Sequence, residues 1–293
     1  MSDTFAPDTQ DDTPKFTYSH PGQSTFRRSL IRMVERLSGQ PMLRDLYLDW
    51  SANPRRDETV FDAALRLLNI TPRCTWHMAR SVIPQSGGLL IVANHPYGIV
   101  DGLALGQLGM QLRGNVQIMT NSVLCQPREL TPHLLPVDFS GTAQARKASG
   151  QSRRLAVELL TQGKVVAIFP GGGIATANAP LHGPAHDSEW HSFLGRLATI
   201  PGVTTLPVHF TGQNSRLFQI ASHLSYPLRI ALIFHETRRL MNTALQMSVG
   251  APIAADDLSL MDRADVATYL PRQKMRMGDS PDEVFVWPSH VRW

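Results

Sequence analysis

The sequence predicts an α/β fold, a single domain with a mixed, mostly parallel sheet flanked by helices. Two apolar runs, 89–93 and 164–169, each end at proline and glycine, as buried strands do where they leave a sheet. A helical pattern over 152–162 leads directly into the second of these runs. Strands that alternate with helices in this way are typical of sheets whose strands run mainly parallel.

The other elements follow from the same patterns. Three further segments have the apolar density of buried elements: 203–210 and 245–253 as strands, and 228–240 as either helix or strand. In the helix over 152–162 we expect Leu155, Leu159 and Leu160 to face the core, and Gly163 to end the helix. We expect a disordered tail over 1–23 and a C-terminal tail over 261–293 that packs only partly.

Composition agrees with one domain. The chain has 293 residues, of which 42% are hydrophobic and 18% charged, enough for one continuous core. Cys74 and Cys125 are too few for a disulfide framework, which favours a reducing compartment. The longest apolar runs are far shorter than the ~20 residues of a spanning helix, and the polar beginning of the chain is unlike a signal peptide. We therefore expect a soluble or peripheral protein.

The first part of the ordered chain, 24–70, is predicted to be helical and amphipathic. Apolar side chains recur at helical spacing on one face: Phe26, Leu30, Met33, Val34 and Leu37. Basic side chains occupy the opposite side: Arg28, Arg32 and Arg36. Such a helix can lie on an anionic membrane, although packing on its own domain explains the pattern equally well. The net charge of +4 favours an acidic partner, such as lipid head groups or an acyl carrier protein, and no motif supports nucleic acid.

The segment that joins the first strand to the next helix carries a histidine and a carboxylate. Asn94, His95, Tyr97 and Gly98 follow the apolar run, and Asp101 opens the helix. A neutral imidazole can take a proton from a hydroxyl if a nearby carboxylate holds its other nitrogen. His95 and Asp101 are therefore the predicted catalytic pair, although Asp101 could equally be a simple helix cap.

The second strand ends in three glycines, Gly171, Gly172 and Gly173, whose backbone N–H groups can converge on an oxyanion. Neither a dinucleotide nor a P-loop pattern is present, so nucleotide binding is not supported. A metal site at His182, His186 and His191 is not expected, because glycine and proline break any helix between the first two. We expect neither a metal nor a bound cofactor.

Four ordered blocks resemble the glycerolipid acyltransferase family, which includes bacterial 1-acylglycerol-3-phosphate acyltransferases. The blocks are Asn94-His95-Pro96 with Asp101-Gly102, Leu135-Pro136-Val137-Asp138, Phe169-Pro170-Gly171-Gly172-Gly173 and Leu206-Pro207-Val208, within about 83–252. The spacing of the first block and the run from Gly212 to Phe218 look most like the branch of lyso-ornithine and related lyso-aminolipid O-acyltransferases, often labelled hemolysin-like. The resemblance implies an acyltransferase domain over 71–260.

Departures from the family pattern bear on the acceptor. Gly171 stands where the family has a glutamate, and no basic residue follows Gly173; in the second block Arg146 is the nearest cation. Two charge-assisted contacts to a phosphomonoester, each worth ~1.5–3 kcal/mol, would thus be lost. A lyso-aminolipid fits better than a lysophospholipid that carries a phosphomonoester. Arg216, with Asn214 beside it, is the predicted contact for the acceptor head group.

The predicted reaction is transfer of a fatty acyl group from a thioester of acyl carrier protein or coenzyme A to a hydroxyl of a lyso-lipid. His95 and Asp101 supply the base, while Asn94, Tyr97, Gly98 and the three glycines surround the substrates. The resemblance implies a peripheral enzyme of membrane lipid biosynthesis at the cytoplasmic face of the bacterial inner membrane. Two alternatives remain: a lipid-ester hydrolase using the same pair on water, and a non-catalytic membrane-binding protein.

Overall fold

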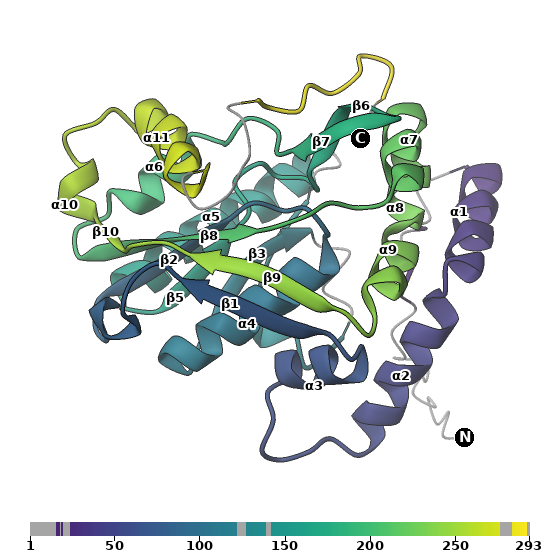
Figure 1. The fold of residues 1–293 in the computed structure, drawn as a ribbon, viewed down its shortest axis with the longest axis horizontal. Coiled ribbons are helices and arrows are strands. Elements are labelled where there is room, and N and C mark those ends of the chain that lie inside the picture. The colour runs from purple at the N-terminus through teal and green to yellow at the C-terminus, as the bar shows by residue number, and fades with distance from the viewer. Residues whose placement is uncertain are drawn as a thin grey trace, which may run out of the picture.

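The computed structural model describes residues 16–17, 19, 24–121, 127–138, 142–275 and 283–291. Over these residues it shows a single α/β domain with a mixed, mostly parallel sheet flanked by helices, which confirms the predicted fold class (Figure 1). The tail expected over 1–23 lies outside the described residues except for Phe16, Thr17 and Ser19. Cys125 and the residues after Asp138 in the second sequence block, Phe139 and Ser140, also lie outside them.

The main sheet is built around a central strand, β2, whose residues are buried on both faces of the sheet. Its strands are β1 (Thr71–Trp76), β2 (Gly88–Ala93), β3 (Gln117–Asn121), β4 (Leu134–Val137), β5 (Val165–Ile168), β8 (Val203–Phe210), β9 (Ala244–Val249) and β10 (Ile253–Ala254). They lie in the order β1-β9-β8-β2-β5-β3-β4, with β10 paired to β8. The five strands from β8 to β4 run parallel, whereas β9 is antiparallel to β8. A separate hairpin consists of β6 (Thr176–Ala179) and β7 (His182–His186).

Helices cover both faces of the sheet (Figure 1). They are α1 (Thr25–Leu37), α2 (Gln40–Ala52), α3 (Val60–Leu67), α4 (Ile99–Arg113), α5 (Ala143–Thr161), α6 (Phe193–Ala198), α7 (Arg216–Leu224), α8 (Tyr226–Ala231), α9 (Ile233–Leu240), α10 (Ala255–Leu258) and α11 (Arg263–Met275). Alternate residues of β2 enter two separate cores, because successive strand side chains point to opposite faces. Leu89 and Ile91 pack with α3, α4 and α9, while Leu90 and Val92 pack with α5, α6 and α11.

Three elements differ from the sequence expectation. The open segment 228–240 belongs to two helices, α8 and α9; Pro227 in the first turn of α8 favours this, since its missing N–H costs nothing there. Helix α5 begins at Ala143, well before the predicted start, because the Thr142 side chain caps it by accepting from the Ala145 N–H. Leu155 is exposed rather than inward, and Ala156 takes its expected place in the core. The strand expected over 245–253 ends at Val249, and β10 is separate.

Several side chains of the C-terminal part pack on the domain. Val266 and Leu270 of α11 are buried in the core that α11 shares with α6. Phe285 is also buried, and its N–H donates to the carbonyl of Asp187 at 2.8 Å. The sequence of α11 is polar around much of the helix, so its pattern did not indicate that Val266 and Leu270 anchor it.

Across the parts of the chain that the structure describes, every helix falls short of the length and apolar character needed to cross a bilayer.

Candidate active site

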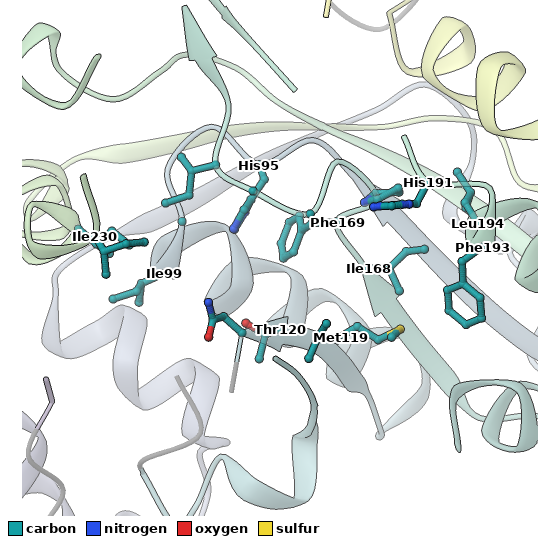
Figure 2. A pocket seen from close by; sticks show the side chains of 18 of the residues that line it. His95, Ile99, Met119, Thr120, Ile168, Phe169, His191, Phe193, Leu194 and Ile230 are labelled. Atoms are coloured by element: carbon teal, nitrogen blue, oxygen red, sulfur yellow. The ribbon is translucent and has the colours of Figure 1, made fainter. Parts of the chain in front are cut away.

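A pocket of about 150 Å³ opens at the carboxyl edge of the parallel strands. His95 follows β2, Phe169 follows β5, and Thr120 and Asn121 end β3. The carboxyl ends of three neighbouring strands therefore meet at this pocket. In Figure 2, His95 lies between an end formed by Ile99 and Ile230 and an end formed by His191, Phe193 and Leu194. This is the edge at which α/β sheets ordinarily bind ligands.

His95 and Asp101 face each other at the wall of this pocket. The His95 Nδ1 atom lies 3.1 Å from the Asp101 Oδ2 atom; the Asp101 side chain is fully buried, and that of His95 is 17% exposed. The Nδ1–H direction is off the line to Oδ2, so the contact is close without being a well-aligned hydrogen bond. Catalytic contacts of this kind tighten when substrate binds. The Nε2 atom is the ring nitrogen that remains for a substrate proton.

Asp101 is a helix cap and the partner of the histidine at once. Its Oδ2 atom accepts the backbone N–H groups of Tyr97 at 2.7 Å and of Gly98 at 3.0 Å, in the turn that begins α4. Gly98 has φ +90°, and a Cβ atom there would lie 2.8 Å from the Ile174 side chain, so the turn requires glycine. The two interpretations left open by the sequence therefore describe one arrangement, in which the cap fixes the carboxylate that faces His95.

Burial sets the protonation of this carboxyl. Loss of solvent raises the pKa of Asp101 above its ordinary value, while His95 and the two capping N–H groups act in the opposite direction. The buried Oδ1 atom has no hydrogen-bond partner among the residues that the structure describes. A positive charge on the imidazole of His95 would strongly stabilise the ionised form of this buried carboxyl.

Side chains on both sides of His95 anchor the turn to β8. The Asn94 side chain donates to the carbonyl of Phe210 and accepts its N–H, both at 2.8 Å, so its amide ties β2 to β8. The Tyr97 hydroxyl donates to the carbonyl of Thr211 at 2.9 Å. Asn94 and Tyr97, predicted as substrate contacts, thus lie beside the catalytic pair, and their polar atoms are occupied in holding the turn.

The same anchor depends on a second glycine. A Cβ atom at Gly212, where φ is +109°, would lie 1.9 Å from the Tyr97 hydroxyl oxygen. No other residue type fits there without displacing the tyrosine.

Asp187 is a site residue that the sequence analysis missed. Its Oδ1 atom accepts the His95 backbone N–H at 3.1 Å, and its Oδ2 atom accepts the Trp190 ring N–H at 3.0 Å. It thereby holds the backbone of the turn that carries His95. Its neighbourhood drew attention in the sequence only as a possible metal cluster; His186 instead lies 3.3 Å from Glu283, and no group able to hold a metal is found among the described residues.

The three glycines are brought to the site as a tight turn. The Gly172 N–H donates to the carbonyl of Phe169 at 3.0 Å, and both Gly172 and Gly173 line the pocket with His95. Gly171 lies behind them against Asp187, where a Cβ atom would be 3.2 Å from the aspartate side chain. Within the described residues, the N–H groups of Gly171 and Gly173 have no hydrogen-bond partner. The Phe169 ring stacks on the His95 ring with centroids 4.0 Å apart, which fixes the imidazole plane.

Asn214 and Arg216 are not brought to the pocket. Arg216 is exposed and donates to the carbonyl of Gly183 in the β6–β7 hairpin at 2.8 Å. Asn214 is buried, with no partner for its side-chain amide among the described residues. Neither residue lines a pocket that contains His95. Both follow β8, but the first turn of α7 directs the chain away from the carboxyl edge.

Two arginines do line the pocket, Arg153 and Arg229, and the sequence analysis missed both; the buried one is Arg229. Its side chain is fully buried in α8, and burial lowers the pKa of its guanidinium to about 9. The signal was present in the sequence: Arg229 stands between apolar residues at the start of the segment 228–240, apart from Arg238 and Arg239 near its end. Because that segment was open between helix and strand, the face on which this arginine lies could not be assigned.

A second, apolar cavity of about 110 Å³ also begins at His95. It continues into a cavity of about 120 Å³ among α2, α3 and α4, and the two share Phe16, Ile99, Leu103, Pro127, Leu130 and Phe234 in their walls. The histidine therefore stands where a mixed pocket meets an apolar channel.

Comparison with known proteins gives the family of this chain. Two curated relatives are each named lyso-glycine lipid O-acyltransferase. The one from Phocaeicola vulgatus is 27% identical over 181 residues, 58% of this chain and 61% of that protein. The one from Bacteroides thetaiotaomicron is 27% identical over 157 residues, 52% of this chain and 55% of that protein. The chain thus spans about three fifths of the length of these relatives or less.

A solved structure of the 1-acyl-sn-glycerophosphate (LPA) acyltransferase PlsC from Thermotoga maritima aligns with 86% of this chain and 95% of that chain, at 13% identity and a TM-score of 0.42. A family model described as Acyltransferase matches residues 42–240, well over half of the chain and the whole of the site just described. The chain therefore belongs to the Acyltransferase family, as the four ordered sequence blocks predicted.

Proposed function

We propose that this chain is a lyso-lipid O-acyltransferase, which moves a fatty acyl group from a thioester of acyl carrier protein or coenzyme A to a hydroxyl of a lyso-aminolipid. The observation that carries the proposal is the position of His95, paired with a buried carboxylate at the junction of a mixed pocket and an apolar channel. That junction suits a reaction that brings a hydroxyl and a fatty chain to one histidine.

In the proposed reaction His95 is a general base. Its Nε2 atom takes the proton of the acceptor hydroxyl while that oxygen attacks the carbonyl carbon of the thioester. Asp101 stabilises the imidazolium that forms, and the free N–H group of Gly173, which lines the pocket, donates to the oxyanion. When the tetrahedral intermediate collapses, the sulfur leaves with the proton from His95. The products are an ester and a thiol, and no covalent enzyme intermediate forms.

The apolar channel provides room for the acyl chain. Its walls are almost entirely aliphatic and aromatic, and it leads from His95 to the interior of the helices α2, α3 and α4. Each methylene group moved from water into such surroundings contributes about 0.8 kcal/mol. A long fatty chain would therefore be drawn in far enough to place its carbonyl carbon beside the histidine.

A lyso-aminolipid is the acceptor that we favour. The family positions for a glutamate and a cation in the third block hold Gly171 and residues 173–176 without charge, which leaves a phosphomonoester poorly compensated there. The two curated relatives are named for a lyso-glycine lipid, which is an aminolipid. The resemblance also supports a peripheral location at the cytoplasmic face of the inner membrane, with α1 as the contact to the lipid surface.

The proposal is tested by measuring acyl transfer from a radiolabelled acyl thioester to a lyso-aminolipid. We expect His95→Ala to lower the rate by at least ~10²-fold with an unchanged unfolding midpoint, since a general base contributes 10²–10⁴. Normal turnover in that variant would remove His95 from the mechanism. Release of free fatty acid without an acceptor would favour a hydrolase, and absence of both reactions in the wild type would favour a membrane-binding protein.

A further inference from the structure

Arg229 is a buried cation without a buried anion. Its side chain is 1% exposed, and among the described residues no carboxylate lies within ion-pair distance of it. Removing a charge from water costs several kcal/mol unless an opposite charge or good hydrogen bonds replace the solvent. The fold itself supplies only part of that compensation.

The neighbours of Arg229 are neutral. Its Nη1 atom donates to the hydroxyls of Thr176 and Ser222, and its Nη2 atom donates to the carbonyl of Ile174. These are three of the five N–H groups of a guanidinium. The remaining two, the Nε–H and one Nη2–H, have no partner among the described residues.

Aromatic rings hold the same guanidinium in a fixed plane. Its central carbon lies 4.8 Å from the ring centroid of Phe218 and 4.9 Å from that of Trp287. The three acceptors lie in β6, in the residues just before β6 and in α7, so elements far apart in the sequence converge to fix one cation. Such preorganisation is what the binding of a charged ligand group requires.

Arg229 is also a residue of the pocket that contains His95. It lines the same pocket as His95, at the end formed by α8, where Tyr226 and Ile230 also lie. Figure 2 shows Ile230 on one side of His95, and His191 and Phe193 on the other. The opposite end carries Arg153, which is exposed and lies over the Phe193 ring at 5.4 Å. The pocket thus has a buried cation at one end and an exposed cation at the other.

We propose that Arg229 binds the carboxylate of the acceptor head group and so selects an anionic lyso-aminolipid. This assignment rests on the proposed acyl transfer. A compact carboxylate fits a buried guanidinium better than the thioester donor does, since a carrier protein or nucleotide needs an open end, such as the one that Arg153 marks. The guanidinium stays protonated at neutral pH, because its lowered pKa of about 9 is still well above 7.

The test compares two acceptors that differ in one charge. One is an N-acylglycine with a hydroxyl on its acyl chain and a free carboxylate, and the other is the methyl ester of that compound. For the wild type we expect the KM for the ester to be at least about tenfold higher than that for the free acid, because the ester loses a charge-assisted hydrogen bond. This measurement requires no variant. Equal KM values for the two acceptors would overturn the assignment of Arg229.

Variants then locate the effect. Arg229→Gln is expected to raise the KM for the free acid at least about tenfold, to change the KM for the ester and for the thioester donor by less than about twofold, and to leave kcat nearly unchanged. Arg229→Lys keeps the charge and is expected to recover part of the preference for the free acid. The matched control is Arg154→Gln, an exposed arginine of α5 outside the pocket, which is expected to keep the wild-type preference.

The outcomes separate the two proposals. Equal losses on both acceptors in Arg229→Gln, with a lowered unfolding midpoint, would show that the arginine serves only the fold. A raised KM for the thioester donor alone would assign the cation to the donor and overturn its role with the acceptor. Absence of transfer to either acceptor in the wild type would overturn the proposed function itself.

Discussion

At the scale of single residues, Asp101 combines a helix cap with a contact to the proposed catalytic base. A cap needs a carboxylate oxygen fixed over the first turn, and Oδ2 is fixed there by two backbone N–H groups. The same fixed oxygen is the one that faces His95. The histidine therefore has a partner whose position is set by the backbone and costs no side-chain entropy when the substrate binds.

Asp101→Asn separates these two tasks, because an amide oxygen can still accept the capping N–H groups but carries no charge. We expect turnover to fall at least ~10²-fold, since the imidazolium loses its counter-charge. The measurement is the initial rate of acyl transfer with saturating thioester. A rate within a few-fold of the wild type would mean that Asp101 is a cap alone.

The same variant predicts a change in the pH dependence of stability. Burial raises the pKa of Asp101 in the folded protein, so above the ordinary value of about 3.9 the folded state holds this proton more tightly than the unfolded state. The wild-type free energy of unfolding should therefore fall as pH rises from there through the raised pKa. Asp101→Asn lacks that loss and should be at least as stable as the wild type at pH 7. Urea unfolding at several pH values measures the free energy of unfolding of both proteins. The same pH dependence of this free energy in the two proteins would contradict the prediction.

At the scale of elements, α4 presents two glycines with opposite surroundings. A Cβ atom at Gly106 would lie 2.2 Å from the Phe61 ring, so this glycine allows α3 to pack against α4. A Cβ atom at Gly102 would meet nothing within 4 Å, and Gly102 lines the apolar channel beside His95. One glycine therefore closes the helix packing, and the other keeps the channel open.

Gly102→Leu is expected to narrow the channel while leaving the fold intact, because leucine favours the helix more than glycine does. Each methylene that can no longer enter costs about 0.8 kcal/mol, so excluding two of them lowers kcat/KM for long-chain donors more than about tenfold relative to short-chain donors. The ratio of rates with long and short acyl thioesters measures this.

The matched control is Gly150→Leu in α5, where a Cβ atom also meets nothing within 4 Å but no pocket with His95 is adjacent. It should keep the wild-type ratio. The same shift in both variants would mean that the channel does not hold the acyl chain.

At the scale of the whole molecule, α1 relates a candidate membrane surface to the pocket. Of the predicted apolar face, Phe26, Met33 and Leu37 are 79%, 53% and 75% exposed. The face that packs on the domain is instead centred on Ile31 and Glu35. Helix α1 packs against α8, the helix that carries Arg229 (Figure 1). A membrane bound at the exposed face would thus lie near the acceptor end of the pocket.

If α1 binds anionic lipid through these apolar side chains and its arginines, Arg28, Arg32 and Arg36 changed together to Gln should weaken binding, at ~1 kcal/mol for each charge near the surface. We expect a loss of about 10²-fold in affinity for anionic vesicles by co-sedimentation, and little change with zwitterionic vesicles, to which the wild type binds weakly. Unchanged partitioning would assign the helix to the domain alone.

The sequence by itself determined four strands of the main sheet, β2, β5, β8 and β9, and the glycine turns, and it predicted His95 and Asp101 as the catalytic pair. The run 89–93 is apolar throughout because both faces of the parallel sheet are buried, and Gly98 stands where the backbone has positive φ. His95 and Asp101 were accessible to sequence reasoning because they lie in one short turn, whose geometry depends on local backbone alone.

Only the tertiary structure decided which distant residues complete the site. Asp187 reaches the His95 backbone across 92 positions, and Arg229 enters the pocket from a helix whose type the sequence left open. Arg216 lies close to the site blocks in the sequence but outside the pocket, because the first turn of α7 directs it elsewhere. Local patterns depend on backbone preference and periodicity, whereas the approach of distant side chains depends on how helices pack on the sheet, and one sequence does not encode that packing in any local signal.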